Sequence, residues 1–509
     1  MIRIRIAQLA SAALLVMAAG FSAPSRADID IAETPLFLQQ PIKPAFIMAL
    51  DDSGSMQWEV LVRNQDGQLY WNQAADSFFN ADGSVRSTGD NNFLELFPFP
   101  GRGTKRRAVP PTPNFGFARS HEFNPAYYNP NSVYTPWKRD RADHPSPWPN
   151  ANPTAAVPDP RRAVSNTNNP AFDLTENIRN TGTAWRFDVR AGMTIMAGTE
   201  YREPAECGGF PGSAGTWRVA ASDFVATGNC GIEFSYYAPT FYLTSPTFPG
   251  YTATPLAIVN PAGGPPGTTL YRYEIRPGNM TGTAYAQQIR NFANWFSYYR
   301  NRNLQLVAAL TESLYDVSFM RVGQFRINNR NTVTMRDLEV VADKEQLYND
   351  LTAINGNNST PNRLAANHLG TEFRRTDAAA PIPSDPNLGG ACQVNAGMLF
   401  TDGYSNSGTV SVGNVDGGMG APFADTIGNT IADIAARHYL DNIRPGVESG
   451  RMRVPAACSN PTPDPRLDCR PDPHMNFYGV TLGALGLIYG ENMNSTNDPY
   501  TYPPPWGAD

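Results

Sequence analysis

Two acidic residues and two serines follow a short apolar run near the amino-terminal end of the chain. The run Pro44–Leu50 (PAFIMAL) stops at the segment Asp51–Ser55 (DDSGS). Because Asp51, Ser53 and Ser55 alternate along one turn, their oxygens can face a shared ion, and the glycine between the serines lets the backbone bend. Mg²⁺ prefers oxygen ligands and keeps several waters, so one carboxylate with neutral hydroxyls suits it. The spacing predicts a divalent-cation site for Mg²⁺, with Mn²⁺ or Ca²⁺ left open; a solvated polar turn is the competing interpretation.

Two later segments can supply further oxygen ligands. Thr360 lies just before a short amphipathic stretch and offers a third hydroxyl. Asp402 follows the apolar run Gly397–Phe400 (GMLF) and offers a second carboxylate. Ligands of open α/β sheets bind outside the carboxyl ends of the strands, so these groups are expected to meet there. The candidate metal ligands are therefore Asp51, Ser53, Ser55, Thr360 and Asp402.

The elements that must position these residues alternate between strands and helices. Apolar spacing predicts one or two helices over 289–317 and others over 347–354, 364–369 and 427–444. Short apolar runs predict strands over 44–50, 319–327, 333–340, 397–400 and 477–482. This alternation predicts an α/β fold whose mostly parallel sheet is covered by helices on both faces.

Residues 57–282 break the pattern. They are rich in Asn, Pro, Gly and aromatic residues and contain few long periodic stretches. A loop of that length inside one domain is implausible, so we predict an inserted module of short strands and irregular chain. Tyr127, Tyr128, Tyr134 and Trp137 are expected to form its core, with a glycan- or protein-binding face as the alternative.

The amino terminus predicts export. Met1–Ala27 combines two early arginines, an apolar run and small residues before a cleavage point, as in a secretory signal peptide. Because exported proteins fold in an oxidising environment, the cysteines are expected to form disulfides. We predict two disulfides, each between cysteines that are close in the sequence. The remaining cysteine either pairs with a group outside the chain or is a buried thiol. The pairs are Cys207 with Cys230 and Cys458 with Cys469, and the remaining cysteine is Cys392.

The charge balance excludes one large class of partner. Forty Lys and Arg residues against 46 Asp and Glu give a net charge of −6. A dedicated nucleic-acid binder usually has a basic excess, so no nucleic-acid partner is expected. No stretch after the signal peptide has the roughly 20 apolar residues that a membrane-spanning helix needs. The mature chain is therefore expected to lack a transmembrane segment.

The oxygen-rich residues, in this order and at strand ends, resemble the metal-ion-dependent adhesion site of von Willebrand factor type A domains. The resemblance implies a doubly wound sheet of that type, interrupted after its first strand by the insertion. It also implies direct ion contacts from Ser53, Ser55 and Thr360 and water-mediated contacts from Asp51 and Asp402. In that family the ion keeps one position open for a carboxylate of a partner, which is binding chemistry, so no enzyme activity is expected.

Several longer segments resemble the PilY family, the type IV pilus tip-associated adhesins of Gram-negative bacteria. They are the strand with its LDDSGSM motif, FNPAYYNPNSVYTPW (123–137), NWFSYYRNR (294–302), CQVNAGMLFTDG (392–403) and ADTIGNTIADIAARHYLDNIRP (424–445). The chain departs from the family at 359–363, which reads STPNR where the family has GTPLR. Family members also continue into a carboxy-terminal β-propeller, and the Pro-rich end of this chain resembles a linker toward it.

The resulting expectation is an exported pilus adhesin and biogenesis factor at the pilus tip or cell surface, passing through the periplasm. Its partners would be minor pilins and a host or abiotic surface ligand that bears a carboxylate. The alternatives are a structural subunit of the tip complex with a stabilising ion and, less favoured, an exported metal-dependent hydrolase. The predicted layout is a signal peptide (1–27), the start of the type A domain (28–56), the insertion (57–282), the rest of that domain (283–495) and a linker (496–509).

Overall fold

The structure is a computed structural model that describes residues 42–482, apart from residues 65, 102–106, 206, 209, 211–214, 262, 421 and 465. The predicted signal peptide and the predicted Pro-rich linker lie outside the described residues.

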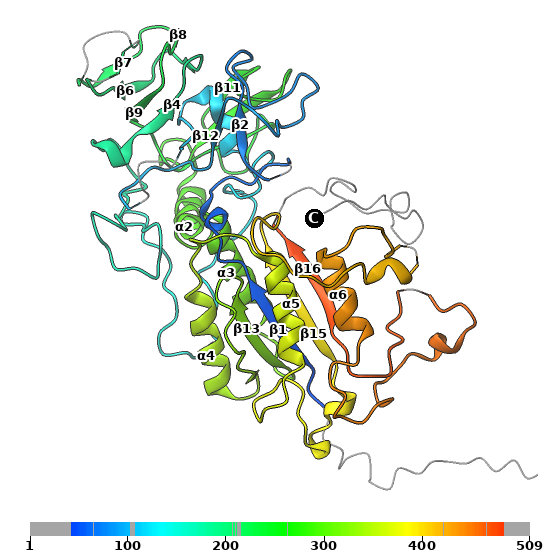
Figure 1. Cartoon of the computed structure of the whole chain (residues 1–509). Helices are drawn as coiled ribbons and strands as arrows, with labels where there is room; N and C mark the ends of the chain where they lie inside the picture. Colours follow the sequence, from blue (N-terminus) through cyan, green and yellow to red (C-terminus); the bar gives the residue numbers. More distant parts are fainter. Residues whose placement is uncertain are drawn as a thin grey trace, which may run out of the picture. The chain divides into compact units, whose positions relative to one another are not determined.

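The apolar run after Lys43 is the central strand of a five-stranded sheet (Figure 1). Strand β1 pairs in parallel with β13 on one side and with β15 on the other, and β15 pairs in parallel with β16. Only the edge strand β14 is antiparallel. In order across the sheet the strands are β14 (Arg336–Asp337), β13 (Arg321–Arg326), β1 (Ala45–Leu50), β15 (Asn395–Thr401) and β16 (Asn476–Thr481).

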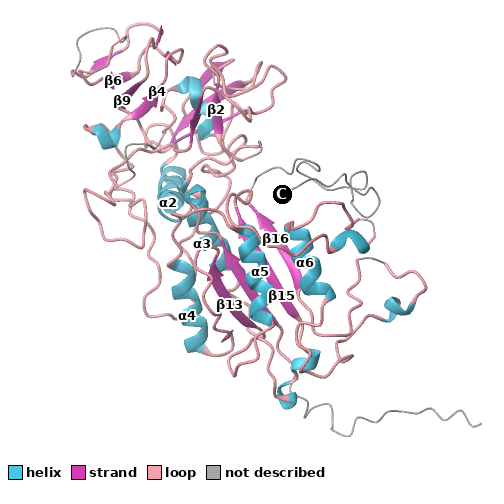
Figure 2. Ribbon diagram, in the orientation of Figure 1, coloured by secondary structure: helices cyan, strands magenta, loops and turns pink. Residues whose placement is uncertain are grey.

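Helices cover both faces of this sheet, which explains why β1 is apolar at nearly every position. Alternate β1 residues, Ile47 among them, pack with Leu369 of α5 on one face. Met48 and Leu50 pack with residues of α3 and α4 on the other face (Figure 2). The α/β fold predicted from the alternating pattern is confirmed. The helices are α2 (Gly282–Tyr298), α3 (Arg302–Ser313), α4 (Val341–Thr352), α5 (Asn362–Phe373) and α6 (Ile431–Leu440).

Two predicted boundaries are wrong. The helix expected over 427–444 spans only Ile431–Leu440, because Thr430 forms a capping box with Asp433 and starts the helix after Ile427. The strand expected over 333–340 is reduced to the two residues of β14. Val333 instead turns its side chain into the core on one face of the sheet, and its backbone N–H donates to Glu372.

The predicted insertion contains small antiparallel sheets and long irregular connections. A single hydrophobic core holds them together, and it also takes Phe292 and Trp295 from α2. Tyr127, Tyr128 and Trp137 are buried, and the Tyr127 hydroxyl donates to the carbonyl of Thr240 at 2.6 Å. The core interpretation is therefore confirmed for Tyr127 and Tyr128, whereas Tyr134 is only partly buried and Trp137 packs in a separate cluster with Tyr298 of α2 and Leu304 of α3. The strands are β2 (Leu69–Trp71), β3 (Asn91–Phe93), β4 (Phe187–Val189), β5 (Thr194–Ile195), β6 (Glu200–Arg202), β7 (Arg218–Val219), β8 (Phe224–Val225), β9 (Cys230–Phe234), β10 (Thr240–Leu243), β11 (Leu256–Val259) and β12 (Thr269–Glu274).

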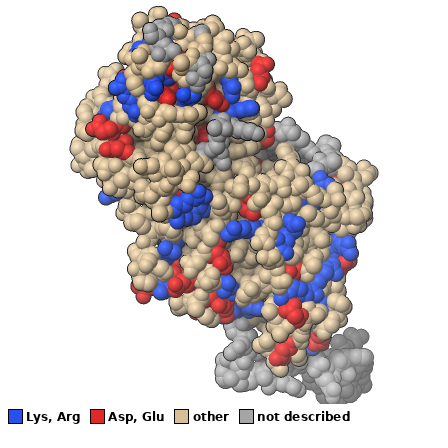
Figure 3. All heavy atoms as spheres, turned by 60° about the vertical axis from the view of Figure 1, so that its left-hand side comes forward, with Lys and Arg blue, Asp and Glu red and all other residues tan. Residues whose placement is uncertain are grey.

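Both predicted disulfides are present, Cys207–Cys230 and Cys458–Cys469. The remaining Cys392 is exposed, so the alternative of a buried thiol is wrong. Among the described helices, none has the length and apolar character needed to span a bilayer. Basic and acidic side chains are interspersed over the face of the molecule shown in Figure 3.

Candidate metal centre

The carboxyl ends of β1 and β15 bring four of the predicted ligands together. Leu50 is paired with Phe400, so the residues that follow the two strands emerge at one edge of the sheet. The Ser53 and Ser55 hydroxyls lie 2.9 Å apart, and the Ser55 hydroxyl donates to Asp402 Oδ1 at 2.7 Å. The oxygens of two hydroxyls and one carboxylate thus form a continuous chain although Ser55 and Asp402 are distant in the sequence.

Asp51 lies beneath this chain and is fully buried. Its Oδ1 accepts the Ser53 backbone N–H at 2.7 Å, and its Oδ2 accepts the Thr401 hydroxyl at 2.8 Å. Burial, and then the nearby charge of Asp402, raise the pKa of Asp51 to about 6. Because protein donors already engage both oxygens, Asp51 is better placed to act on an ion through water than to bind it directly.

Thr360 reaches the same edge on a neighbouring loop. The backbone N–H of Gly54 donates to the carbonyl of Asn358 at 2.8 Å, which holds this loop against the Ser53 turn. The Thr360 backbone N–H donates to Asn406 Oδ1 at 2.7 Å, and the residue is buried. Thr360 therefore lies on the loop that contacts the Ser53 turn, but the hydrogen-bonded chain that joins Ser53, Ser55 and Asp402 does not pass through its side chain.

Sequence reasoning missed a buried arginine in contact with the centre. Arg302, the first residue of α3, donates from Nη1 to Asp402 Oδ2 at 2.8 Å, and both side chains are almost completely buried. Burial lowers the pKa of Arg302, and the opposite charge of Asp402 counteracts this. The residue lies in the NWFSYYRNR segment, but no spacing rule connects that segment with Asp402.

Two further polar residues shape the edge without belonging to the predicted set. Asp52 Oδ1 accepts the side-chain amide of Asn328 at 2.8 Å, and its carbonyl accepts the Asn357 N–H at 2.9 Å, so it ties two loops together. Asn362, which departs from the family pattern, donates to the Thr401 hydroxyl at 3.1 Å and to the Gly403 carbonyl at 3.0 Å. Asn362 thereby orients the threonine that donates to Asp51.

The donor set fits a hard divalent cation. The five predicted ligands all offer side-chain oxygens, and the Ser55 hydroxyl can keep donating to Asp402 while its lone pairs face an ion. The two carboxylates are offset by one guanidinium, so the centre retains a single net negative charge when Asp51 is ionised. The residues that would hold the ion are Ser53, Ser55 and Thr360, with Asp51 and Asp402 orienting its waters.

Sequence comparison provides the relatives. No family model and no solved structure matches the chain. Type IV pilus biogenesis factor PilY1 of Pseudomonas aeruginosa strain PAK is 22% identical over 490 residues, which cover 90% of this chain and 33% of that protein. PilY1 of strain UCBPP-PA14 is 24% identical over 489 residues, covering 92% of this chain and 33% of the relative. The chain is a distant homologue of PilY1. It spans about a third of the length of these relatives.

The homology to PilY1 extends over nine-tenths of the chain. It therefore includes the insertion as well as the α/β sheet. The resemblance to the PilY family that was inferred from the sequence segments is confirmed by this match.

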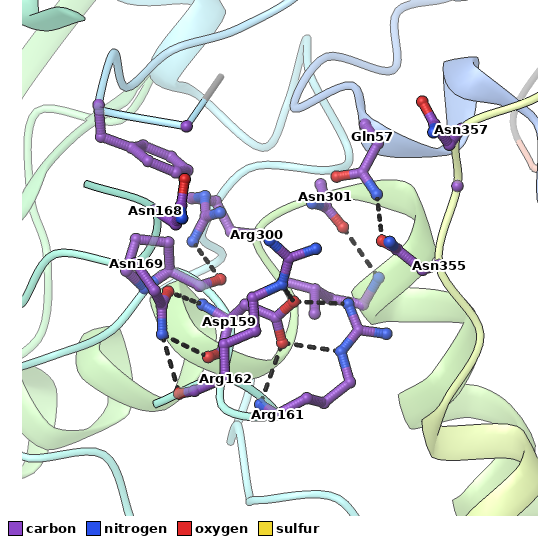
Figure 4. A pocket seen from close by; sticks show the side chains of 15 residues that line it. Gln57, Asp159, Arg161, Arg162, Asn168, Asn169, Arg300, Asn301, Asn355 and Asn357 are labelled. Atoms are coloured by element: carbon purple, nitrogen blue, oxygen red, sulfur yellow. Dashed lines mark hydrogen bonds and ion pairs between the residues drawn. The ribbon is translucent and has the colours of Figure 1, made fainter. Parts of the chain in front are cut away.

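A polar pocket of about 210 Å³ lies next to the candidate centre in this PilY1 homologue. Gln57, two residues after Ser55, donates to Asn355 Oδ1 at 3.0 Å on one side of this pocket. On the insertion side Asp159 lies between Arg161 and Arg162, as Figure 4 shows. Half of the Arg162 side chain is exposed, and its Nε lies 3.3 Å from Asp159 Oδ2, so its charge is already paired at this edge.

A second cluster of metal-ligating side chains occurs in the described residues at Asp140, His144 and Glu345. His144 Nε2 lies 3.8 Å from Asp140 and 3.7 Å from Glu345. His144 Nδ1, however, accepts the backbone N–H of Ser146 at 3.0 Å, which leaves the proton of the neutral ring on Nε2. With Arg141 bonded to both carboxylates, this is an ion-pair network between the insertion and α4.

Proposed function

We propose that the chain is part of an exported type IV pilus biogenesis factor that binds a divalent cation and, through it, a carboxylate of a partner. Its homology to PilY1 supports the pilus role. The ion would be Mg²⁺, or Mn²⁺ or Ca²⁺, in a von Willebrand type A domain interrupted by the insertion. The doubly covered, mostly parallel sheet agrees with such a domain.

The observation that carries the metal proposal is the chain of oxygens at the carboxyl edge of the sheet. Ser53, Ser55 and Asp402 come from two distant segments, and the Ser55 hydroxyl lies within hydrogen-bonding distance of both the Ser53 hydroxyl and Asp402. A cation bound mainly by neutral hydroxyls retains enough positive charge to attract an incoming carboxylate. The partner that bears this carboxylate is a surface ligand or a minor pilin.

Calorimetric titration of Mg²⁺ and Mn²⁺ into chelator-stripped protein tests the ion site. The wild type is expected to bind one ion, and the Ser53→Ala/Ser55→Ala variant to lose that binding. Ser165 and Thr167 provide a matched control, because their hydroxyls also lie 2.9 Å apart but in an exposed turn of the insertion. The Ser165→Ala/Thr167→Ala variant should bind like the wild type. A folded wild type that binds neither Mg²⁺ nor Mn²⁺, and that also fails to bind Ca²⁺ in a third titration, would refute the proposal.

One observation favours a second function, an ion that only stabilises the pilus tip complex. Asp51, Ser53, Thr360 and Asp402 are all at most 4% exposed, which limits access for a partner. Ion-loaded protein applied to carboxylated and to uncharged surfaces, with no pilin present, separates the two functions. Ion-dependent retention on the carboxylated surface supports adhesion. Thermal stabilisation by the ion without any retention supports the structural role.

A further inference from the structure

Arg302 contacts two separate parts of the molecule from a fully buried position. Besides Asp402, its guanidinium donates to the carbonyls of Val60 and Gly67, each at 2.9 Å. It also lies over the ring of Trp58, 4.8 Å from the ring centroid. The same group thus holds a carboxylate of the candidate centre and the first turn of the insertion.

The fit around this guanidinium is close. Gly67 has a left-handed backbone with φ of 72°, and a Cβ there would lie 2.5 Å from Arg302 Nη2. The neighbouring Arg300 is buried in a comparable way, but its Nε donates to Glu59 at 2.7 Å, so its charge is matched away from Asp402. Of these two buried arginines near the start of α3, Arg302 is the one whose charge is paired with a carboxylate of the candidate centre, Asp402.

We propose that Arg302 is a positioning residue that acts as an internal counter-ion for Asp402 and competes with the divalent cation for that carboxylate. The inference rests on the proposed metal site. In the ion-free protein Arg302 neutralises Asp402 and holds it at the edge of the sheet. When a cation binds, two positive groups share one buried carboxylate, so Arg302 lowers the affinity for the ion. Arg302 is held in place by its hydrogen bonds to the carbonyls of Val60 and Gly67, which belong to the insertion. The insertion therefore influences the ion affinity without contacting the ion.

A competing charge and a purely structural residue predict opposite changes in ion affinity when Arg302 is removed. If Arg302 only held the site in shape, its removal would weaken ion binding. If it is a competing charge, its removal strengthens ion binding while it destabilises the ion-free protein. Coupling is reciprocal, so the cation must also stabilise the variant more than it stabilises the wild type.

Arg302→Gln tests the proposal, since the amide retains a donor for Val60 and removes the charge. We expect Mg²⁺ to bind at least about tenfold more tightly to this variant than to the wild type, within the usual range of coupling between sites. The rise in melting temperature caused by Mg²⁺ should also be larger. Arg300→Gln is the matched control, and it should lower the melting temperature of the ion-free protein without changing the affinity for Mg²⁺.

Equal or weaker binding of Mg²⁺ by Arg302→Gln, beside a wild type that binds, would overturn the inference and leave the metal site standing. Failure of both proteins to bind any ion would instead refute the proposed function. If Arg302→Gln does not fold in chelator, the proposal requires Mg²⁺ to restore its cooperative unfolding transition. A variant that stays unfolded in saturating Mg²⁺ would show that Arg302 has only a structural role.

Discussion

Asp51 and Asp402 are both acidic residues at strand ends, but their replacement should have very different effects on stability. Asp402→Ala leaves the fully buried Arg302 without its carboxylate. Removing one partner of a buried ion pair typically costs about 3–5 kcal/mol of unfolding free energy. Asp51→Asn, in contrast, keeps an oxygen to accept the Ser53 N–H and loses at most the two hydrogen bonds that Oδ2 accepts from the Thr401 hydroxyl and the Asp402 N–H, each worth about 1 kcal/mol.

The pKa of Asp51 widens this difference. A folded-state pKa of about 6, above the ordinary value of 3.8, means that the ionised carboxylate destabilises the folded protein. The stability contributed by protonated Asp51 is complete below pH 3.8 and is lost as the pH rises through 6. At pH 8 the cost of the charge is about 3 kcal/mol, and the asparagine removes it. We therefore expect Asp51→Asn to be neutral or stabilising in the ion-free protein.

Guanidinium chloride unfolding at pH 8 in EDTA, with the disulfides intact, measures both variants. The Arg302→Met/Asp402→Ala double variant is the control, because removing both partners of the pair should restore several kcal/mol relative to Asp402→Ala. The reasoning fails if Asp402→Ala and Asp51→Asn differ by less than about 1 kcal/mol. It also fails if the double variant is no more stable than Asp402→Ala.

Three further outcomes are expected. Burial, and then the charges of Arg374 and Arg437, lower the pKa of His438 to about 4, so its contribution to stability is present above pH 6.5 and is lost as the pH falls toward 4. Relative to His438→Phe, the wild type should lose about 3 kcal/mol between pH 7 and pH 4 in urea unfolding, and parallel curves would contradict this. A Cβ on Gly370 would overlap the His438 ring, so Gly370→Ala should cost about 1–3 kcal/mol despite its better helix propensity, and addition of His438→Ala should recover part of that loss in a double-mutant cycle. Native protein should react with one equivalent of a thiol reagent at the exposed Cys392, and the Cys392→Ser variant should not react.

The elements around the site were predictable because their signals are local. The apolar run 44–50 ends at polar residues, and strand β1 ends at Leu50 for the same reason. The start of α6 also has a local signal, since Thr430 precedes Asp433 by three residues, but the apolar spacing that begins at Ile427 pointed to an earlier start. Here the backbone hydrogen bonds of the cap outweighed the hydrophobic pattern.

The amino-acid sequence by itself determined the positions of the strands that carry the site, the order of the oxygen-bearing residues at their ends and the two local disulfides, because each depends on residues close together in the chain. The tertiary structure decided which groups meet at the edge of the sheet. Arg302 is 100 residues from Asp402, and Asn362 reaches Thr401 from the start of another helix. A buried charge takes the partner that packing brings within hydrogen-bonding distance, and no periodicity or spacing in the sequence records that distance.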